Sequence, residues 1–379
     1  MNRKWNANAH LARLAWVIIM GITLWLMLFA FTGERFTPVR MASYLAPWMA
    51  ALLLITVAGT IAHRRRLAIT SLLLTVVVGY PYLGLLVPLR GAPASEAAGY
   101  KVMTYSKMGR NHDIAAVSRV VRSQRPDLLF MQEIGEGESA ALIDQLGDLY
   151  NGQPIHALAD NHYGLILSRF PLHSRLKTGD SALHAEVTFP GSSVSVWNLH
   201  LPKSMASTQA EYDAVEQLVG QLIRQPGPTI VAGDLNATQI NHPYLAIAQH
   251  LDNAFEKAGF GMGFTFPSPA RRMGWITPFM RIDHIFVSGH FQIHDVYVVD
   301  EAGGSDHYPV VAVVGMDNAI LQSQENDLSA SGGGVDSAPS VRLFAPPSDD
   351  RVRPSGGDNA HGPAVGLDGV ASRVTSHTH

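Results

Sequence analysis

Three long apolar runs near the N-terminus constrain this chain more than any other feature. They span residues 14–31, 44–62 and 67–89, and none of them contains a charged residue. Each is within or close to the ~17–25 residues that a helix needs to cross the hydrocarbon core of a membrane. We therefore expect three transmembrane helices in a membrane anchor at residues 1–90. The alternative is one cleaved signal peptide followed by buried core helices.

Basic residues around these runs predict the orientation of the anchor. Arg3, Lys4 and Arg13 precede the first run, and residues 64–66, all arginines, lie between the second and the third. Segments rich in Lys and Arg tend to stay in the cytoplasm, so both are expected there. An odd number of spans then carries the rest of the chain to the opposite face. The sequence thus predicts a multi-pass protein of the bacterial cytoplasmic (inner) membrane, with its main domain extracytoplasmic.

Beyond the anchor, the composition divides the chain into a linker, one large domain and a tail. Residues 91–99 are rich in Ala, Gly and Pro, which predicts a linker. Residues 317–379 are rich in Ser, Gly, Asp and Pro with few large apolar residues, so this tail is expected to be disordered. Residues 100–316 between them are long enough for one catalytic domain.

Charge and cysteine content narrow the chemistry of this domain. Residues 100–316 carry 15 basic and 21 acidic residues, a net charge of −6. Basic side chains supply most of the sequence-independent affinity for nucleic acid, so a small phosphorylated substrate is favoured over DNA or RNA. The chain has no cysteine, which excludes disulfides, zinc-thiolate sites and thiol catalysis. Oxygen and imidazole groups remain as ligands for any metal.

Short β-rich segments alternate with amphipathic stretches along the domain. Apolar residues recur on one face at residues 113–123 and 209–223, which predicts two helices. Many strands with few helices predict two packed sheets covered by helices. Strands are expected at residues 101–105, 128–132, 164–168, 184–189, 194–201, 229–232, 283–287, 292–299 and 309–314.

Five polar clusters lie at the ends of expected strands. Each is a weak signal alone, because Asp-Leu-Asn is often a turn and a histidine inside an apolar strand is often part of the core. Polar residues at strand ends converge on one rim of a sandwich, where a rigid scaffold can support a site. Their joint presence in this order therefore predicts a catalytic centre. The clusters are Gln132-Glu133, Asn198-Leu199-His200, Gly233-Asp234-Leu235-Asn236, Asp283-His284 and Ser305-Asp306-His307.

Together with Ser-Arg-Phe-Pro at residues 168–171, these clusters resemble the motifs of the endonuclease/exonuclease/phosphatase family. The resemblance covers about residues 100–315 and implies an α/β fold, a four-layer αββα sandwich of the DNase I type. Three spans followed by such a domain also look like the membrane-bound branch of VanJ-type proteins. The implied activity is metal-dependent hydrolysis of a phosphate ester or pyrophosphate at the extracytoplasmic membrane face. Phosphorylated small molecules and lipid-linked phosphates are the implied substrates.

The same resemblance implies roles for individual residues. Glu133 and Asp306 would ligate Mg²⁺ or Mn²⁺, hard cations that prefer carboxylates. Asp234 would orient or deprotonate the attacking water, while Asn236 holds the phosphate and the nucleophile. The other catalytic residues would be His200, as a donor to the phosphate, and His307 paired with Asp283, as the stabiliser of transition-state charge.

Substrate contacts are implied for Asn198 and for the loop that contains Thr265 and Phe266. Arg271, Arg272 and Arg281 follow this loop. They predict either a basic and apolar rim for a lipid-linked phosphate or an ordinary solvated loop, and both readings stay open.

One position departs from the family pattern. The first strand of the family normally ends in an Asn that helps to ligate the metal, whereas Ser106 stands there in this chain. A hydroxyl can also contact a metal, so we expect weaker metal binding with function retained. Two alternatives to the phosphoesterase remain: an extracytoplasmic nuclease, and a catalytically weak homologue that only binds its ligand.

Overall fold

The computed structural model describes residues 2–86, 99–159, 164–173, 181–203, 209–224, 227–270 and 278–317. The expected linker, apart from its last residue, and the expected tail beyond residue 317 therefore lie outside the described residues. Arg271 and Arg272 lie outside them as well.

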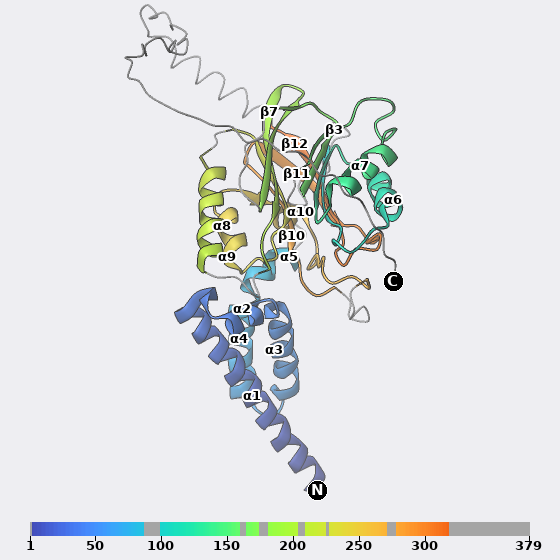
Figure 1. Cartoon of the computed structure of the whole chain (residues 1–379). Helices are drawn as coiled ribbons and strands as arrows, with labels where there is room; N and C mark the ends of the chain where they lie inside the picture. Colours follow the sequence, from blue (N-terminus) through green and yellow to red (C-terminus); the bar gives the residue numbers. More distant parts are fainter. Residues whose placement is uncertain are drawn as a thin grey trace, which may run out of the picture. The chain divides into compact units, whose positions relative to one another are not determined.

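Helices form throughout the apolar N-terminal region (Figure 1). Two described helical segments, Ala9–Arg35 and Arg65–Leu86, are long and apolar enough to cross a membrane. A pair of shorter helices, bent by 68°, gives a third span if it is counted as one. Two to three spans are thus supported where three were expected. The elements are α1 (Asn2–Thr32), η1 (Gly33–Arg35), α2 (Thr37–Ser43), α3 (Ala46–Thr60), α4 (Arg65–Gly79), η2 (Tyr80–Tyr82) and α5 (Leu83–Leu86).

The first sheet of the domain that follows the anchor has six strands in the order β11-β12-β1-β2-β4-β3. Its central strands β1 and β2 are parallel, and the other neighbours are antiparallel. Parallel strands cannot be joined by a tight turn, so the chain crosses between them through helix α6 (Ile114–Gln124). The strands are β1 (Tyr100–Ser106), β2 (Leu128–Gln132), β3 (His156–Ala159), β4 (Gly164–Ser168), β11 (Phe291–Val298) and β12 (Val310–Met316).

The second sheet also has six strands, in the order β5-β6-β7-β8-β10-β9. Like the first sheet, it contains one parallel pair joined by a crossover helix: β7 and β8 are parallel, and helix α8 (Gln209–Leu222) connects them. The strands approach so closely that a Cβ at Gly233 would lie 1.9 Å from the Leu199 carbonyl oxygen, which requires glycine there. The strands are β5 (Leu172–His173), β6 (Ala182–Phe189), β7 (Ser192–His200), β8 (Thr229–Asp234), β9 (Asp252–Asn253) and β10 (Asp283–Val287).

The two sheets pack face to face, and helices cover their outer faces (Figure 1). Val102 and Phe130 of the first sheet share a core with Val196 and Ile230 of the second. Helices α6 and α7 (Glu136–Gln145) pack on the outer face of the first sheet. Helices α8 and α9 (His242–Ala248) pack on the outer face of the second. The short α10 (Ala254–Ala258) completes the domain. The α/β fold expected from the motifs is therefore present, with two mixed six-stranded sheets.

All nine expected strands are confirmed, three of them with identical bounds, and so are both expected helices. The strands that the sequence did not predict are β3, β5 and β9, which lie at sheet edges. They have only two to four residues, too few for a hydrophobic alternation to be detected.

Candidate active site

The C-terminal ends of the two parallel strand pairs bring the polar clusters together. In the first sheet, Ser106 is in register with Gln132, the residue before Glu133. In the second sheet, His200 is in register with Asp234. Parallel strands end at the same edge of a sheet, which is where ligands bind in α/β folds. Asp283, the first residue of the antiparallel β10, pairs with Asp234 across the ladder.

A buried histidine flanked by carboxylates forms the centre of the site. The Nδ1 atom of His307 lies 2.9 Å from Asp283 Oδ2, and its Nε2 atom lies 3.8 Å from Asp234 Oδ2 and 3.9 Å from Asp306 Oδ1. Burial alone would lower the pKa of His307, but Asp283, Asp234 and Asp306 together raise it to about 10. The imidazole is therefore positively charged at neutral pH.

Asp234 is fully buried and held in place by Asn236. Its Oδ1 atom accepts a 2.8 Å hydrogen bond from the Asn236 backbone N–H, and its Oδ2 atom accepts one from the Asn236 side chain at 3.3 Å. Burial and the negative charges of Asp283 and Glu133 raise the pKa of Asp234 to about 7, against the attraction of His307. Asn236 itself has a left-handed backbone with φ of 47°. Non-glycine residues in this conformation cluster at functional sites, where the surrounding contacts stabilise them.

Glu133 lies on the first-sheet side of the centre and also has a left-handed backbone, with φ of 57°. Its Oε2 atom accepts a 2.6 Å hydrogen bond from the Gly109 N–H, and its Oε1 atom lies 3.7 Å from His200 Nε2. Burial opposes ionisation of Glu133, yet the Gly109 bond and nearby positive charges hold its pKa below the usual value. Burial lowers the pKa of His200, only partly offset by Glu133, so its imidazole is neutral at neutral pH.

The structure adds one supporting residue that sequence reasoning missed, Lys107. Its side chain is fully buried, and its Nζ atom lies 2.8 Å from Glu138 Oε2 and 2.9 Å from the Asn111 carbonyl oxygen. Lys107 thereby fixes the turn from which Gly109 donates to Glu133. A lysine directly after a buried strand was the only signal for it.

The donor set fits a hard divalent cation. Two groups of side chains each bring their ligand atoms within 4.8 Å of one another: Glu133, His200 and Asp234, and Asp234, Asp283 and His307. The Ser106 Oγ and Asp283 Oδ1 atoms are buried at this edge without a hydrogen-bond partner. Native proteins satisfy most buried polar atoms, so unpartnered oxygens beside clustered carboxylates are the environment expected around a Mg²⁺-type ion.

The expected substrate loop lies against Asp283 and His307. Thr265 is fully buried, and its Oγ1 atom accepts from the backbone N–H of Ile282 at 3.2 Å and of Asp283 at 3.4 Å. The Phe266 ring packs on His307 with centroids 4.8 Å apart. Thr265 thus positions the carboxylate that holds His307, while Phe266 covers the imidazole. Whether either residue contacts substrate remains a prediction.

Arg281 is buried, which contradicts both readings of this loop for this residue, because the rim and the solvated loop each require an accessible arginine. Only 2% of it is exposed. Its guanidinium lies 4.6 Å from the Phe255 ring centroid and donates to Gln239 Oε1 at 3.0 Å. It lies two residues before the buried strand β10, and a cation in such a buried position needs these partners.

Asn198 links the two sheets beneath the site. Its Nδ2 atom donates to the backbone oxygens of Met131 at 2.7 Å and Leu165 at 3.1 Å. Its Oδ1 atom accepts from Gln132 Nε2 at 2.7 Å. These bonds engage both ends of the amide with the opposite sheet, so we propose that Asn198 supports the site rather than binding substrate.

Asn198→Ala is accordingly expected to lower the free energy of unfolding by about 3 kcal/mol, because the buried oxygens of Met131 and Leu165 lose a donor and Gln132 loses its shortest hydrogen bond. Thermal unfolding of the full-length protein, followed by tryptophan fluorescence, measures this loss. Gln249→Ala, which removes an exposed amide at the C-terminal end of α9, is the control and should change stability little. An Asn198 variant as stable as the control would instead favour a role for Asn198 in substrate binding.

Comparisons with known proteins agree with this geometry. The model of the Endonuclease/Exonuclease/phosphatase family matches residues 95–307. The UPF0294 protein VV2535 of Vibrio vulnificus is 30% identical over 132 residues, 35% of this chain and 43% of that protein. The chain therefore matches less than half the length of this relative.

Solved structures with a similar fold include an endonuclease/exonuclease/phosphatase from Bacteroides vulgatus. It is 18% identical, and the alignment covers 58% of this chain and 100% of that one with a TM-score of 0.48. The mannosyl-6-phosphatase Bt3783 of Bacteroides thetaiotaomicron is 20% identical, covering 57% of this chain and 100% of that one with a TM-score of 0.45.

Proposed function

Because the chain belongs to the endonuclease/exonuclease/phosphatase family, we propose that it hydrolyses a phosphate ester or pyrophosphate at the extracytoplasmic face of a bacterial cytoplasmic membrane, with a divalent metal ion as cofactor. Phosphoester hydrolysis is the general activity of this family. The observation that carries the proposal is the position of His307, whose Nδ1 atom lies 2.9 Å from Asp283 and whose Nε2 atom lies 3.8 Å from Asp234.

Asp234 and His307 divide the chemistry between them. With a pKa of about 7, Asp234 accepts a proton from a water molecule at neutral pH and so generates the nucleophile. His307 supplies a positive charge next to Asp234, where its Nε2–H would donate to phosphoryl oxygens as negative charge develops on them. Asn236 keeps the Asp234 carboxylate oriented through its two hydrogen bonds. The neutral His200 offers a further N–H to the phosphate.

Mg²⁺ or Mn²⁺ would supply additional positive charge to the phosphoryl group when bound. Glu133 and Asp306 are our proposed ligands, with the unpartnered Ser106 hydroxyl as a weaker third. Glu133 suits this role because its lowered pKa keeps it ionised over the physiological range.

Charge supports a small or lipid-linked phosphate as the substrate. The net charge of −6 over residues 100–316 opposes tight binding of a polyanion, which disfavours the nuclease alternative. The likeness to VanJ-type membrane proteins remains a prediction about architecture and supplies no substrate.

Contacts of the anchor support the proposed membrane face. Glu34, directly after α1, and Leu85, in α5, both hydrogen-bond to the catalytic domain, at His242 and Gly261. α1 and α4 therefore end on the side of that domain, and α3 returns the chain between them. Residues 64–66, all arginines, then lie at the far ends of α3 and α4. Arginine-rich loops favour the cytoplasm, so the domain lies on the other face.

The test is metal-dependent hydrolysis by the full-length protein in lipid nanodiscs. We expect phosphate release with Mg²⁺ or Mn²⁺ from at least one of isoprenyl pyrophosphates, phosphatidic acid, glycerol phosphate or nucleotides. Chelation with EDTA should lower the rate at least about 100-fold, and added metal should restore it. Glu133→Gln should raise the half-saturating metal concentration.

Two outcomes would contradict the proposal. Full activity in EDTA would exclude the metal-dependent mechanism. Faster cleavage of plasmid DNA than of every small phosphate, with affinity falling steeply as salt rises, would favour the nuclease instead.

A further inference from the structure

The membrane anchor reaches the active-site loops through a short segment, residues 34–48, which we call the docking segment. It contains η1, α2 and the start of α3. Three of its side chains, Glu34, Tyr44 and Trp48, hydrogen-bond to the catalytic domain. None of these contacts is needed merely to tether the domain, because residues 91–99 already join the two parts of the chain.

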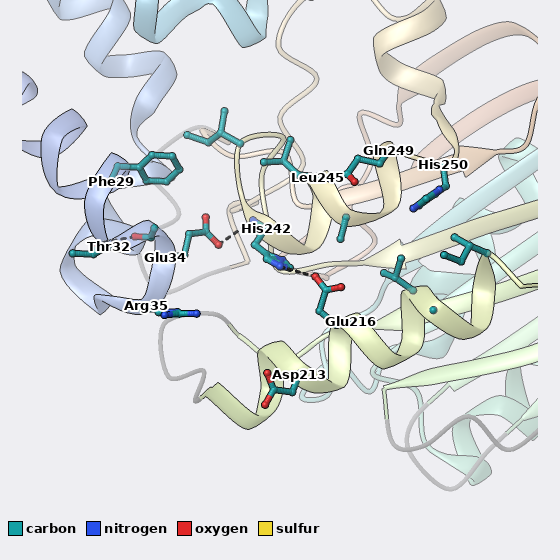
Figure 2. Close-up of a pocket in the computed structure, with 16 residues that line it drawn as sticks. Phe29, Thr32, Glu34, Arg35, Asp213, Glu216, His242, Leu245, Gln249 and His250 are labelled. Carbon is teal, nitrogen blue, oxygen red and sulfur yellow. Dashed lines mark hydrogen bonds and ion pairs between the residues drawn. The ribbon is translucent and has the colours of Figure 1, made fainter.

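The docking segment holds both ends of the loop that begins at the catalytic Asp234. Near the start of this loop, the Tyr44 hydroxyl donates to the backbone oxygen of Asn236. At its end, the Glu34 carboxylate accepts from the Asn241 side chain and, at 3.0 Å, from the His242 backbone N–H (Figure 2). Asn236 has the left-handed backbone described above, so a bond to its carbonyl oxygen helps to stabilise a strained conformation.

Glu34 is buried, with only 7% of its surface exposed, although it lies at the end of an apolar helix. A buried carboxylate is costly unless it is hydrogen-bonded. The bonds from Asn241 and His242 satisfy it, and the buried Arg40 donates to the Glu34 backbone oxygen at 3.1 Å. This arrangement makes the contact between anchor and loop specific.

Trp48 packs against the segments that contain Phe264 and Phe279. Its indole Nε1 donates to the Phe279 backbone oxygen at 3.1 Å, and its ring stacks on Phe264 with centroids 5.7 Å apart. Phe264 and Phe279 belong to the two segments that pair through Phe266 and Met280, and Phe266 covers the catalytic His307. Trp48 is still 46% exposed, so its ring offers an apolar surface where these segments meet the anchor.

From these contacts we propose that the docking segment is part of the active site, and that the substrate is an amphiphilic phosphoester. In this arrangement Tyr44 is a positioning residue for Asn236, and Trp48 is a specificity residue that contacts the apolar chain. The exposed Leu45 and Leu52 extend the same surface along the anchor. Trp and Tyr favour the membrane interface, where one end of a side chain is apolar and the other is hydrated. This inference rests on the proposed phosphoesterase activity and specifies its substrate class.

The test compares two pyrophosphates that share a reacting group but differ in apolar length, farnesyl and isopentenyl pyrophosphate. Full-length protein in phosphatidylcholine nanodiscs is assayed with Mg²⁺. Trp48→Ala should lower kcat/KM for farnesyl pyrophosphate about tenfold, mainly through KM, and change that for isopentenyl pyrophosphate less than twofold. Tyr44→Phe should lower kcat about tenfold for both substrates with KM unchanged. Trp16→Ala, an exposed tryptophan in α1, is the control and should change neither.

A second measurement needs no substrate. Hydrogen exchange of the His242 amide should accelerate about tenfold in Glu34→Gln, which weakens the acceptor, and stay unchanged in Trp16→Ala. Unchanged exchange would overturn the docking contact.

In the kinetic test, equal effects of Trp48→Ala on both pyrophosphates, or no effect on either, would overturn the substrate class while leaving the phosphoesterase intact. A wild-type protein that hydrolyses neither pyrophosphate but releases phosphate from a soluble phosphate would likewise reject the amphiphilic substrate. If the wild-type protein released phosphate from none of the substrates tested, the proposed function itself would be contradicted.

Discussion

His307→Gln is expected to lower kcat about 1000-fold while KM stays within about threefold. The variant keeps a side chain of similar reach but removes the positive charge that Asp283, Asp234 and Asp306 stabilise. This charge acts on the developing negative charge of the transition state more than on the bound ester, so its loss appears in kcat. Steady-state kinetics on the best substrate with saturating metal measures the effect. If this variant kept more than a tenth of the wild-type kcat, His307 would not be the residue that stabilises the transition state.

Asp283→Asn is the matched variant, because it keeps the imidazole and weakens its support. Asp283 is the largest of the charges that raise the pKa of His307 to about 10. A histidine with a raised pKa stays charged below that pKa and loses its charge as the pH rises through it. The alkaline limb of the wild-type kcat profile should therefore lie near pH 10 and move to lower pH in Asp283→Asn. An unchanged alkaline limb would show that another group titrates there.

The catalytic cluster was accessible from sequence because each of its members lies at the end of a strand. Glu133, Asp234, Asp283 and His307 each neighbour an apolar run whose period predicts a strand, and parallel strand ends meet at one edge. The structure brings these residues together, and the roles implied for them remain predictions. The sequence did not indicate in which direction the buried side-chain amide of Asn198 points. Asn198 satisfies the same motif whether it points to substrate or, as here, to Met131 and Leu165.

The docking segment shows a second limit of sequence reasoning. Tyr44 and Trp48 lie within a run that is apolar enough for a membrane span, and their partners Asn236 and Phe279 are about 190 and 230 residues away. No local pattern encodes such a pairing. One boundary was nevertheless visible in the sequence, because Pro47 lies in the first turn of α3. Proline favours the first turn of a helix, which agrees with the start of α3 at Ala46, two residues after the start of the apolar run.

Asp234→Asn is expected to abolish activity and yet stabilise the metal-free protein at pH 8. The folded-state pKa of Asp234 is raised from 3.8 to about 7, because burial and neighbouring carboxylates oppose its charge. The folded state then binds the proton more tightly than the unfolded chain does, so stability falls as the pH rises from about 4 to 7. A neutral Asn avoids this cost and should raise the free energy of unfolding by about 2 kcal/mol at pH 8.

Thermal unfolding in EDTA at pH 4 and pH 8 separates this effect from a general change in packing. The two proteins should differ little in stability at pH 4, where Asp234 is protonated in the folded state and still partly protonated in the unfolded chain, and the variant should be more stable at pH 8. Its kcat should be at least about 1000-fold lower, because an amide cannot accept the proton of the attacking water. Added Mg²⁺ should stabilise the wild type more than the variant, since a cation offsets the repulsion among Glu133, Asp234 and Asp283. If the variant were less stable than wild type at pH 8, the ionised Asp234 would be stabilised by its surroundings even without metal. That result would contradict its raised pKa and would favour a homologue that only binds its ligand.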